Sequence, residues 1–125
     1  METMRVLVVD DEADFLHSVV KRLNLRKIQA DGVESGGAAL KYLSEQAADV
    51  VVLDVKMPDK SGLVVLEEIK RRHPGVEVII LTGHTAVDAN IEGVNLGAFD
   101  YLIKPVRIEA LLEKIKAAYA KKTGA

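Results

Sequence analysis

The sequence predicts a doubly wound α/β fold, in which one five-stranded parallel sheet carries helices on both of its faces. The first indication is a set of short apolar runs without polar alternation, as expected of strands that are covered on both sides. The second is that helix-period segments separate these runs, and the third is that the connections are short. We expect a single domain over 1–125, with a core over 4–119 and a short polar tail over 120–125.

The first half of the chain contains three predicted strands and two predicted helices. Asp11 is expected to cap the first helix, because an aspartate just before an apolar helical stripe is a preferred N-cap. The second strand is weaker than the others because Gly32 interrupts it. In order along the chain, the predicted elements are a strand over 5–9, a helix over 12–26, a strand over 28–33, a helix over 35–46 and a strand over 50–54.

The second half repeats the alternation. A helix opens at Ser61 and Gly62, and Pro74 with Gly75 breaks it. Gly97 closes the helix that follows the fourth strand. The remaining predicted elements are a strand over 76–81, a helix over 85–96, a strand over 99–103 and a helix over 106–122.

Composition excludes several classes of function. The 125 residues are 49% hydrophobic and 29% charged, with a net charge of -2, which gives no basic field for direct binding of nucleic acid. The absence of cysteine excludes disulfides, thiol catalysis and thiolate metal sites. No stretch approaches the roughly 18 apolar residues of a membrane span, and the N-terminus is too polar for a signal peptide. We therefore expect a cytoplasmic protein.

Polar residues stand at the ends of four of the five predicted strands. Asp10 and Asp11 follow the first strand, Asp54 ends the third, Thr82 follows the fourth and Lys104 follows the fifth. A single acid could merely cap or end a strand. Because the carboxyl ends of parallel strands lie at one edge of a sheet, the whole set is expected to meet there.

Three carboxylates in one cleft require a partner. Two such charges about 4 Å apart repel by roughly 4 kcal/mol at an effective dielectric near 20. The cluster therefore protonates one member or recruits a cation, and oxygen ligands without cysteine favour Mg²⁺. Lys104 and Thr82 are suited to bind phosphoryl oxygens. These residue types predict a site at which a carboxylate attacks phosphorus.

Four segments in this order make the chain resemble a response-regulator receiver domain of two-component signalling, from Val6 to about Tyr119. They are an apolar strand with Asp10-Asp11, then Leu53-Asp54-Val55-Lys56-Met57-Pro58 with Gly62, then Leu81-Thr82-Gly83, and finally Gly97-Ala98-Phe99-Asp100-Tyr101-Leu102-Ile103-Lys104-Pro105. The resemblance implies a flavodoxin-like (βα)5 fold with strand order 2-1-3-4-5.

The resemblance also implies a phosphoacceptor and a metal site. Asp54 would accept a phosphoryl group from the phosphohistidine of a sensor histidine kinase or a phosphotransfer protein. Asp11, Asp54 and the backbone carbonyl of Lys56 would bind Mg²⁺, and Asp10 would act through a metal-bound water. The domain would catalyse its own phosphoryl uptake and a slow autodephosphorylation, without being an enzyme in the usual sense.

The resemblance further implies a conformational switch. Thr82 and Lys104 would engage the phosphoryl oxygens, and Tyr101 would turn inward as Thr82 moves. This movement would change the face formed by the helix over 85–96, the strand over 99–103 and the last helix, where a phosphorylation-dependent homodimer or an output partner would bind. The Lys104-Pro105 peptide bond would be cis.

Two other functions stay open. The first is an aspartyl-phosphate phosphohydrolase similar to the haloacid dehalogenases, although Lys56 stands two residues after Asp54 where those enzymes carry a second aspartate. The second is a flavodoxin-like nucleotide or flavin binder, although two acids occupy the loop that would cradle a phosphate. Receiver domains often have a glycine turn before the second strand, where this chain has Lys27, and Lys56 and His84 lie at variable positions expected to tune the phosphoryl lifetime.

Overall fold

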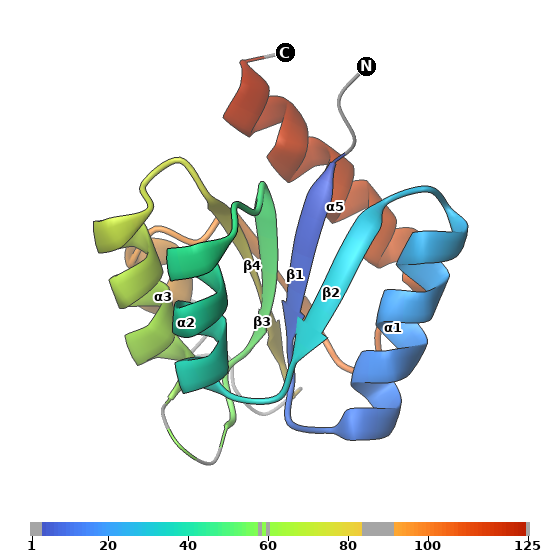
Figure 1. Ribbon diagram of the computed structural model, residues 1–125, viewed down its shortest axis with the longest axis horizontal. Helices are drawn as coiled ribbons and strands as arrows, with labels where there is room; N and C mark the ends of the chain where they lie inside the picture. The colour runs from blue at the N-terminus through green and yellow to red at the C-terminus, as the bar shows by residue number, and fades with distance from the viewer. Residues whose placement is uncertain (1–3, 58, 60, 84–91, 125) are drawn as a thin grey trace.

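The computed structural model describes residues 4–57, 59, 61–83 and 92–124 and contains one five-stranded sheet (Figure 1). All of its strand pairs are parallel, and their order is β2-β1-β3-β4-β5. The predicted fold class and strand order are therefore confirmed. The strands are β1 (Arg5–Val9), β2 (Gln29–Val33), β3 (Val50–Asp54), β4 (Glu77–Thr82) and β5 (Asp100–Ile103).

Helices cover both faces of the sheet (Figure 1). Those on one face are α1 (Ala13–Leu25) and α5 (Ile108–Thr123), and those on the other are α2 (Gly36–Glu45) and α3 (Gly62–Arg72). Most of the helix predicted over 85–96 lies outside the described residues, and its described part is helical over 92–95.

The sheet separates two apolar cores. One side packs Leu16 and Leu23 of α1 with Leu111 and Ile115 of α5, and the other packs residues of α2 and α3. All five residues of β3 and all six of β4 are buried, as the unbroken apolar runs predict. The central strand that ends in Asp54 is thus held from both faces.

The N-terminus of α1 differs from the prediction that Asp11 caps it. The N-cap residue is Glu12, and no side chain caps this end of the helix. The amide of Glu12 instead donates to Asp10 Oδ1 at 2.9 Å. The helix thus begins one residue later than predicted, and the exposed Asp11 does not cap it.

α5 continues to Thr123, one residue beyond the predicted helix over 106–122, so much of the segment expected as a polar tail over 120–125 is helical. Two lysines of this last turn form ion pairs at the amino end of the sheet: Lys121 with Glu77 at 3.6 Å and Lys122 with Asp49 at 3.0 Å. Asp49 also accepts a hydrogen bond from the Arg5 amide at 2.9 Å. The start of β1 and the end of α5 therefore lie at the same end of the molecule (Figure 1).

The turn between α1 and β2 is a Schellman motif with a lysine in the left-handed position. Lys27 has a φ of 64°, its amide donates to the Asn24 carbonyl at 3.0 Å, and the Ile28 amide donates to the Leu23 carbonyl at 3.2 Å. Glycine usually occupies this position because a Cβ is strained there. Lys27 therefore stands where the resemblance leads one to expect a glycine, with the backbone of a glycine turn.

We expect Lys27→Gly to stabilise the protein, because it removes this strain. The gain should be about 0.5–1 kcal/mol in the free energy of unfolding, measured by urea denaturation, since part of the relief is offset by the greater freedom of glycine in the unfolded chain. Lys27→Ala is the matched control: it removes the same charge but keeps the Cβ, so it should leave stability unchanged. Equal effects of the two substitutions would contradict the strain argument.

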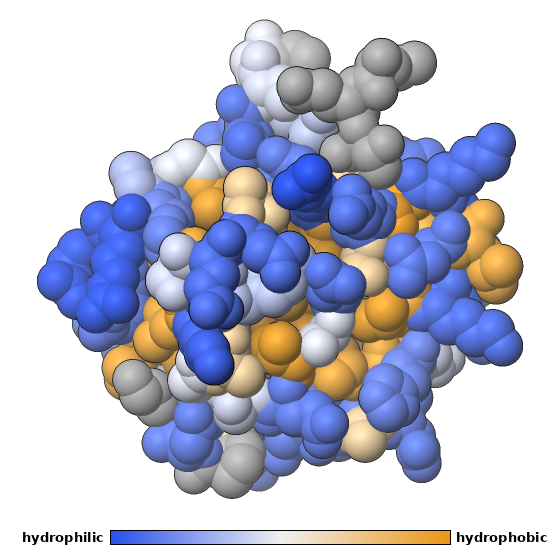
Figure 2. Space-filling view, viewed as in Figure 1, coloured by the Kyte–Doolittle hydropathy of each residue, from blue (hydrophilic) through white to orange (hydrophobic). Residues whose placement is uncertain are grey.

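Charged and polar side chains cover much of the surface seen in Figure 2, with smaller apolar areas between them. Among the described helices, none is both long and apolar enough to pass through a membrane.

Candidate functional site

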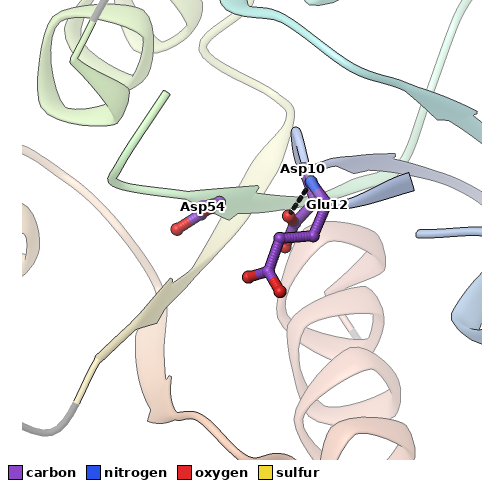
Figure 3. Close-up of side chains that lie close together, drawn as sticks. All are labelled: Asp10, Glu12 and Asp54. Carbon is purple, nitrogen blue, oxygen red and sulfur yellow. Dashed lines mark hydrogen bonds between the residues drawn. The ribbon is translucent and has the colours of Figure 1, made fainter. Parts of the chain in front are cut away.

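The pairing of β1 with β3 brings two of the predicted acids together. Val9 lies opposite Leu53, so that Asp10 and Asp54 follow at neighbouring strand ends. Figure 3 shows Asp54 from β3 beside Asp10 and Glu12, which follow β1. Carboxylate oxygens of these three residues lie within 4.8 Å of one another. The carboxyl edge of the sheet thus carries an acidic group, as the strand endings predict.

The acidic group opens onto a cavity of about 410 Å³ at this edge of the sheet. Asp54 is 5% exposed and lines this cavity, Asp10 is fully buried beneath it, and Glu12 is exposed. The residues lining the cavity are Asp11, Glu12, Asp54, Lys56, Met57, Gly83 and Lys104. Four of the predicted site residues therefore border one space.

Lys104 reaches into the acidic group from the end of β5. Its amide donates to the Thr82 carbonyl at 2.8 Å, and the peptide bond that follows it, Lys104-Pro105, is cis. Its Nζ lies 2.8 Å from Asp10 Oδ2, 2.9 Å from Glu12 Oε1 and 3.6 Å from Asp54 Oδ2. Burial opposes the charge of the amine, but its interactions with the accepting carboxylates of Asp10 and Glu12 outweigh burial, so the pKa of Lys104 is raised.

Asp54 is the acid whose proton affinity is most changed. Burial, followed by the charge of Asp10, raises the pKa of Asp54 to about 6, although Lys104 and a 3.2 Å hydrogen bond from the Lys56 amide favour its charged form. One lysine thus does not balance the acids around it. A carboxylate held in this way is ready to gain a further cation, because a positive charge would relieve both burial and repulsion.

Glu12 is the site residue that sequence reasoning missed. Its carboxylate accepts a hydrogen bond from Lys104, which lowers the pKa of Glu12. The contact joins residues 92 positions apart, so no local pattern predicts it. Asp11, which was predicted in the metal site, lines the cavity, whereas Glu12 belongs to the close group of three.

Thr82 is the last residue of β4, and Tyr101 lies on the neighbouring edge strand β5. Thr82 is 1% exposed, and its Oγ1 has no hydrogen-bond partner among the residues that the structure describes. The next residue, Gly83, lines the cavity. Tyr101 on β5 is 38% exposed, and His84 lies outside the described residues. The hydroxyl of Thr82 is thus a buried polar group that is available to a ligand.

The loop after β3 is tied to two helices. The Gly62 amide donates to the Val55 carbonyl at 2.7 Å, which joins α3 to the end of β3. Asp59 accepts hydrogen bonds from the amides of Gly36 and Gly37 at 3.1 and 2.9 Å, at the start of α2. These contacts fix the segment that carries Lys56, and the role of Asp59 was not predicted.

Comparisons with known proteins agree with this geometry. The family described as "Response regulator receiver domain" matches residues 6–116. The chain is 37% identical over 117 residues to the DNA-binding transcriptional regulator NtrC of Escherichia coli K12, covering 91% of this chain and 25% of that protein. It is 35% identical over 113 residues to the transcriptional regulatory protein PrrA of Mycobacterium tuberculosis, covering 90% of this chain and 48% of that protein.

Solved structures agree as well. The crystal structure of a CheY-like response regulator receiver domain protein from Methanospirillum hungatei JF-1 superposes with a TM-score of 0.94 at 28% identity, covering 98% of both chains. The two regulators above are longer, and the chain spans about a quarter and about half of their lengths.

Proposed function

Since the chain belongs to the response regulator receiver domain family, we propose that it is a phosphorylation-controlled signalling switch whose phosphoacceptor is Asp54. The observation that carries this proposal is the meeting of Asp54, Asp10 and Lys104 above one cavity, with the pKa of Asp54 raised to about 6. The donors of the phosphoryl group are a sensor histidine kinase or a phosphotransfer protein, and the protein acts in the cytoplasm.

Magnesium is the cation that this site fits. The nearby ligand atoms are all oxygens, which suit a hard divalent ion, and burial together with the charge of Asp10 raises the pKa of Asp54. Asp11, Asp54 and the backbone carbonyl of Lys56 would hold the ion, and Asp10 would contact it through water. When bound, Mg²⁺ supplies positive charge next to the transferred phosphoryl oxygens.

In the transfer step, a carboxylate oxygen of Asp54 attacks the phosphorus of the phosphohistidine. A P–O bond forms while the P–N bond breaks, and the imidazole nitrogen leaves with the electron pair of that bond. Lys104 and the Thr82 hydroxyl donate to the phosphoryl oxygens, for which the buried and unpartnered Oγ1 of Thr82 provides a ready donor. Slow attack of water on the aspartyl phosphate restores the free acid.

The conformational change that follows phosphorylation begins at Thr82 and reaches Tyr101. Phosphorylation adds negative charge and acceptor oxygens, which draw the Thr82 hydroxyl toward Asp54. The ring of Tyr101, now exposed on β5, turns inward into the space that Thr82 leaves. The face formed by residues 92–96, β5 and α5 thereby changes, and with it the binding of a second copy or of an output partner.

Mass spectrometry after incubation with acetyl phosphate and Mg²⁺ tests this proposal. We expect the mass of one phosphoryl group to be added to the wild type, and Asp54→Asn to gain none. Asp14→Asn, an exposed acid in the first turn of α1, is the control and should be labelled normally. Uptake by Asp54→Asn at the wild-type rate would overturn the assignment, and sustained turnover of a small phosphate ester would favour the phosphohydrolase alternative.

A further inference from the structure

The amine of Lys104 is surrounded by negatively charged groups. An ammonium group has three N–H donors. Three carboxylate oxygens lie around Nζ, from Asp10 at 2.8 Å, Glu12 at 2.9 Å and Asp54 at 3.6 Å. The ring of Phe15, whose centroid lies 4.6 Å away, borders the amine as well. A phosphoryl oxygen that binds this lysine therefore competes with the carboxylates that already surround it.

The three acceptors differ in how readily they can leave. Asp10 is fully buried, so moving away from Lys104 would strand its charge without water. Asp54 is the residue that carries the phosphoryl group. The side chain of Glu12 is 65% exposed, so its carboxylate can turn into water and be solvated there. Glu12 is thus the acceptor whose separation from Lys104 costs the least free energy.

We propose that Glu12 is a displaceable counter-ion, which holds Lys104 in the unphosphorylated protein and is exchanged for a phosphoryl oxygen when Asp54 is modified. This inference rests on the proposed phosphorylation of Asp54 and adds a positioning residue to it. Glu12 acts through Lys104 and does not itself contact the reacting atoms. The exchange makes the unphosphorylated state more stable and sets how strongly a phosphoryl group is retained.

The position of Glu12 explains how the exchange is confined to one contact. Glu12 is the N-cap residue of α1 and its amide is held by Asp10 Oδ1, so its backbone stays fixed while its side chain is free to turn. Release of the side chain therefore leaves the helix unchanged. A contact that must be broken before the phosphoryl group binds weakens that binding by the strength of the contact, which for an exposed ion pair corresponds to about two- to fivefold.

Beryllofluoride, a mimic of the phosphoryl group, measures the exchange at equilibrium. With saturating Mg²⁺, we expect Glu12→Gln to bind beryllofluoride about two- to fivefold more tightly than the wild type, because Lys104 no longer has to be released. Glu12→Asp keeps the charge but shortens the side chain by one methylene, so it should also bind more tightly. Asp14→Asn removes a negative charge in the first turn of α1, and this variant should bind beryllofluoride like the wild type.

The variants separate the possible causes. Tighter binding by both Glu12 variants supports the exchange, and it should disappear when Lys104 is replaced by Gln in the same background. Tighter binding by Glu12→Gln alone would show a general field effect and overturn the exchange. Weaker binding by Glu12→Gln would show that Glu12 helps to hold the cation, which also overturns it. If the wild type binds no beryllofluoride, the proposed function itself fails, whereas equal binding by all variants refutes only the role of Glu12.

Discussion

Asp54→Asn should raise the free energy of unfolding at pH 7 in metal-free buffer, even though it removes the proposed phosphoacceptor. The reason is that burial and the charge of Asp10 make the ionised Asp54 unfavourable in the folded protein, which raises its pKa from an ordinary 3.8 to about 6. Each pKa unit corresponds to about 1.4 kcal/mol, so the gain should reach at most about 3 kcal/mol. The asparagine oxygen can still accept the hydrogen bond from the Lys56 amide.

The gain in the free energy of unfolding that Asp54→Asn brings should depend on pH. Between about pH 4 and pH 6 the folded wild type binds a proton at Asp54 that the unfolded chain has lost, so its stability falls as the pH rises through this window. Above pH 6 the difference from Asp54→Asn is fully developed, and below pH 4 it vanishes. Mg²⁺ should narrow the difference at pH 7, because it binds the folded wild type through the carboxylate.

Urea denaturation at pH 4, 5, 6 and 7 measures this difference. Asp100→Asn is a matched control with the opposite sign. Burial raises the pKa of Asp100, but the hydrogen bonds from Lys114 and the Tyr101 amide outweigh it and lower this pKa overall. Asp100→Asn should therefore destabilise the protein at pH 7, and this loss should shrink as the pH falls. If Asp54→Asn is less stable than the wild type at pH 7, the ionised form of Asp54 is not unfavourable in the folded protein.

Gly62→Ala should disrupt both stability and the site. A Cβ at this position would lie 2.3 Å from the carbonyl oxygen of Asp54 and 2.5 Å from the Cα of Val55, which are backbone atoms that cannot turn aside. We expect a loss of roughly 2–3 kcal/mol in the free energy of unfolding, because α3 must move away from the end of β3. The same movement should displace Asp54 and slow its phosphorylation by acetyl phosphate.

Gly75→Ala is the control for this substitution. A Cβ at Gly75 meets no atom within 4 Å, so the same chemical change should shift the unfolding free energy by no more than about 0.5 kcal/mol. Urea denaturation and the rate of phosphoryl uptake should be measured on both variants. If Gly62→Ala keeps wild-type values in both measurements, α3 does not position the phosphoacceptor.

The sheet and the strand-end residues could be predicted from sequence because their signals are local. An unbroken apolar run such as Val50 to Leu53 predicts a strand buried on both faces, and parallel pairing then brings Asp10 and Asp54 to one edge without further information. The left-handed conformation of Lys27 in the Schellman turn could not be predicted in this way, because only the backbone of the structure reveals it.

The contacts that sequence reasoning missed join distant segments through side chains. Glu12 meets Lys104 across 92 positions, and Asp59 meets the amides of α2 across more than 20. An exposed glutamate after two aspartates looks like an ordinary start of a helix, and the cap expected of Asp11 is absent because the helix begins one residue later, with Glu12 at the N-cap position. Such pairings depend on rotamers and loop paths, which no hydrophobic period encodes.

Asp49 joins the two extremities of the fold, since it accepts from the Arg5 amide and pairs with Lys122 at the end of the sheet remote from the acidic cavity. A polypeptide fused upstream of β1 or downstream of α5 would therefore emerge on the side away from the phosphoacceptor. An attached domain would leave the acidic cavity open, so the unit is geometrically suited to modular reuse within larger proteins.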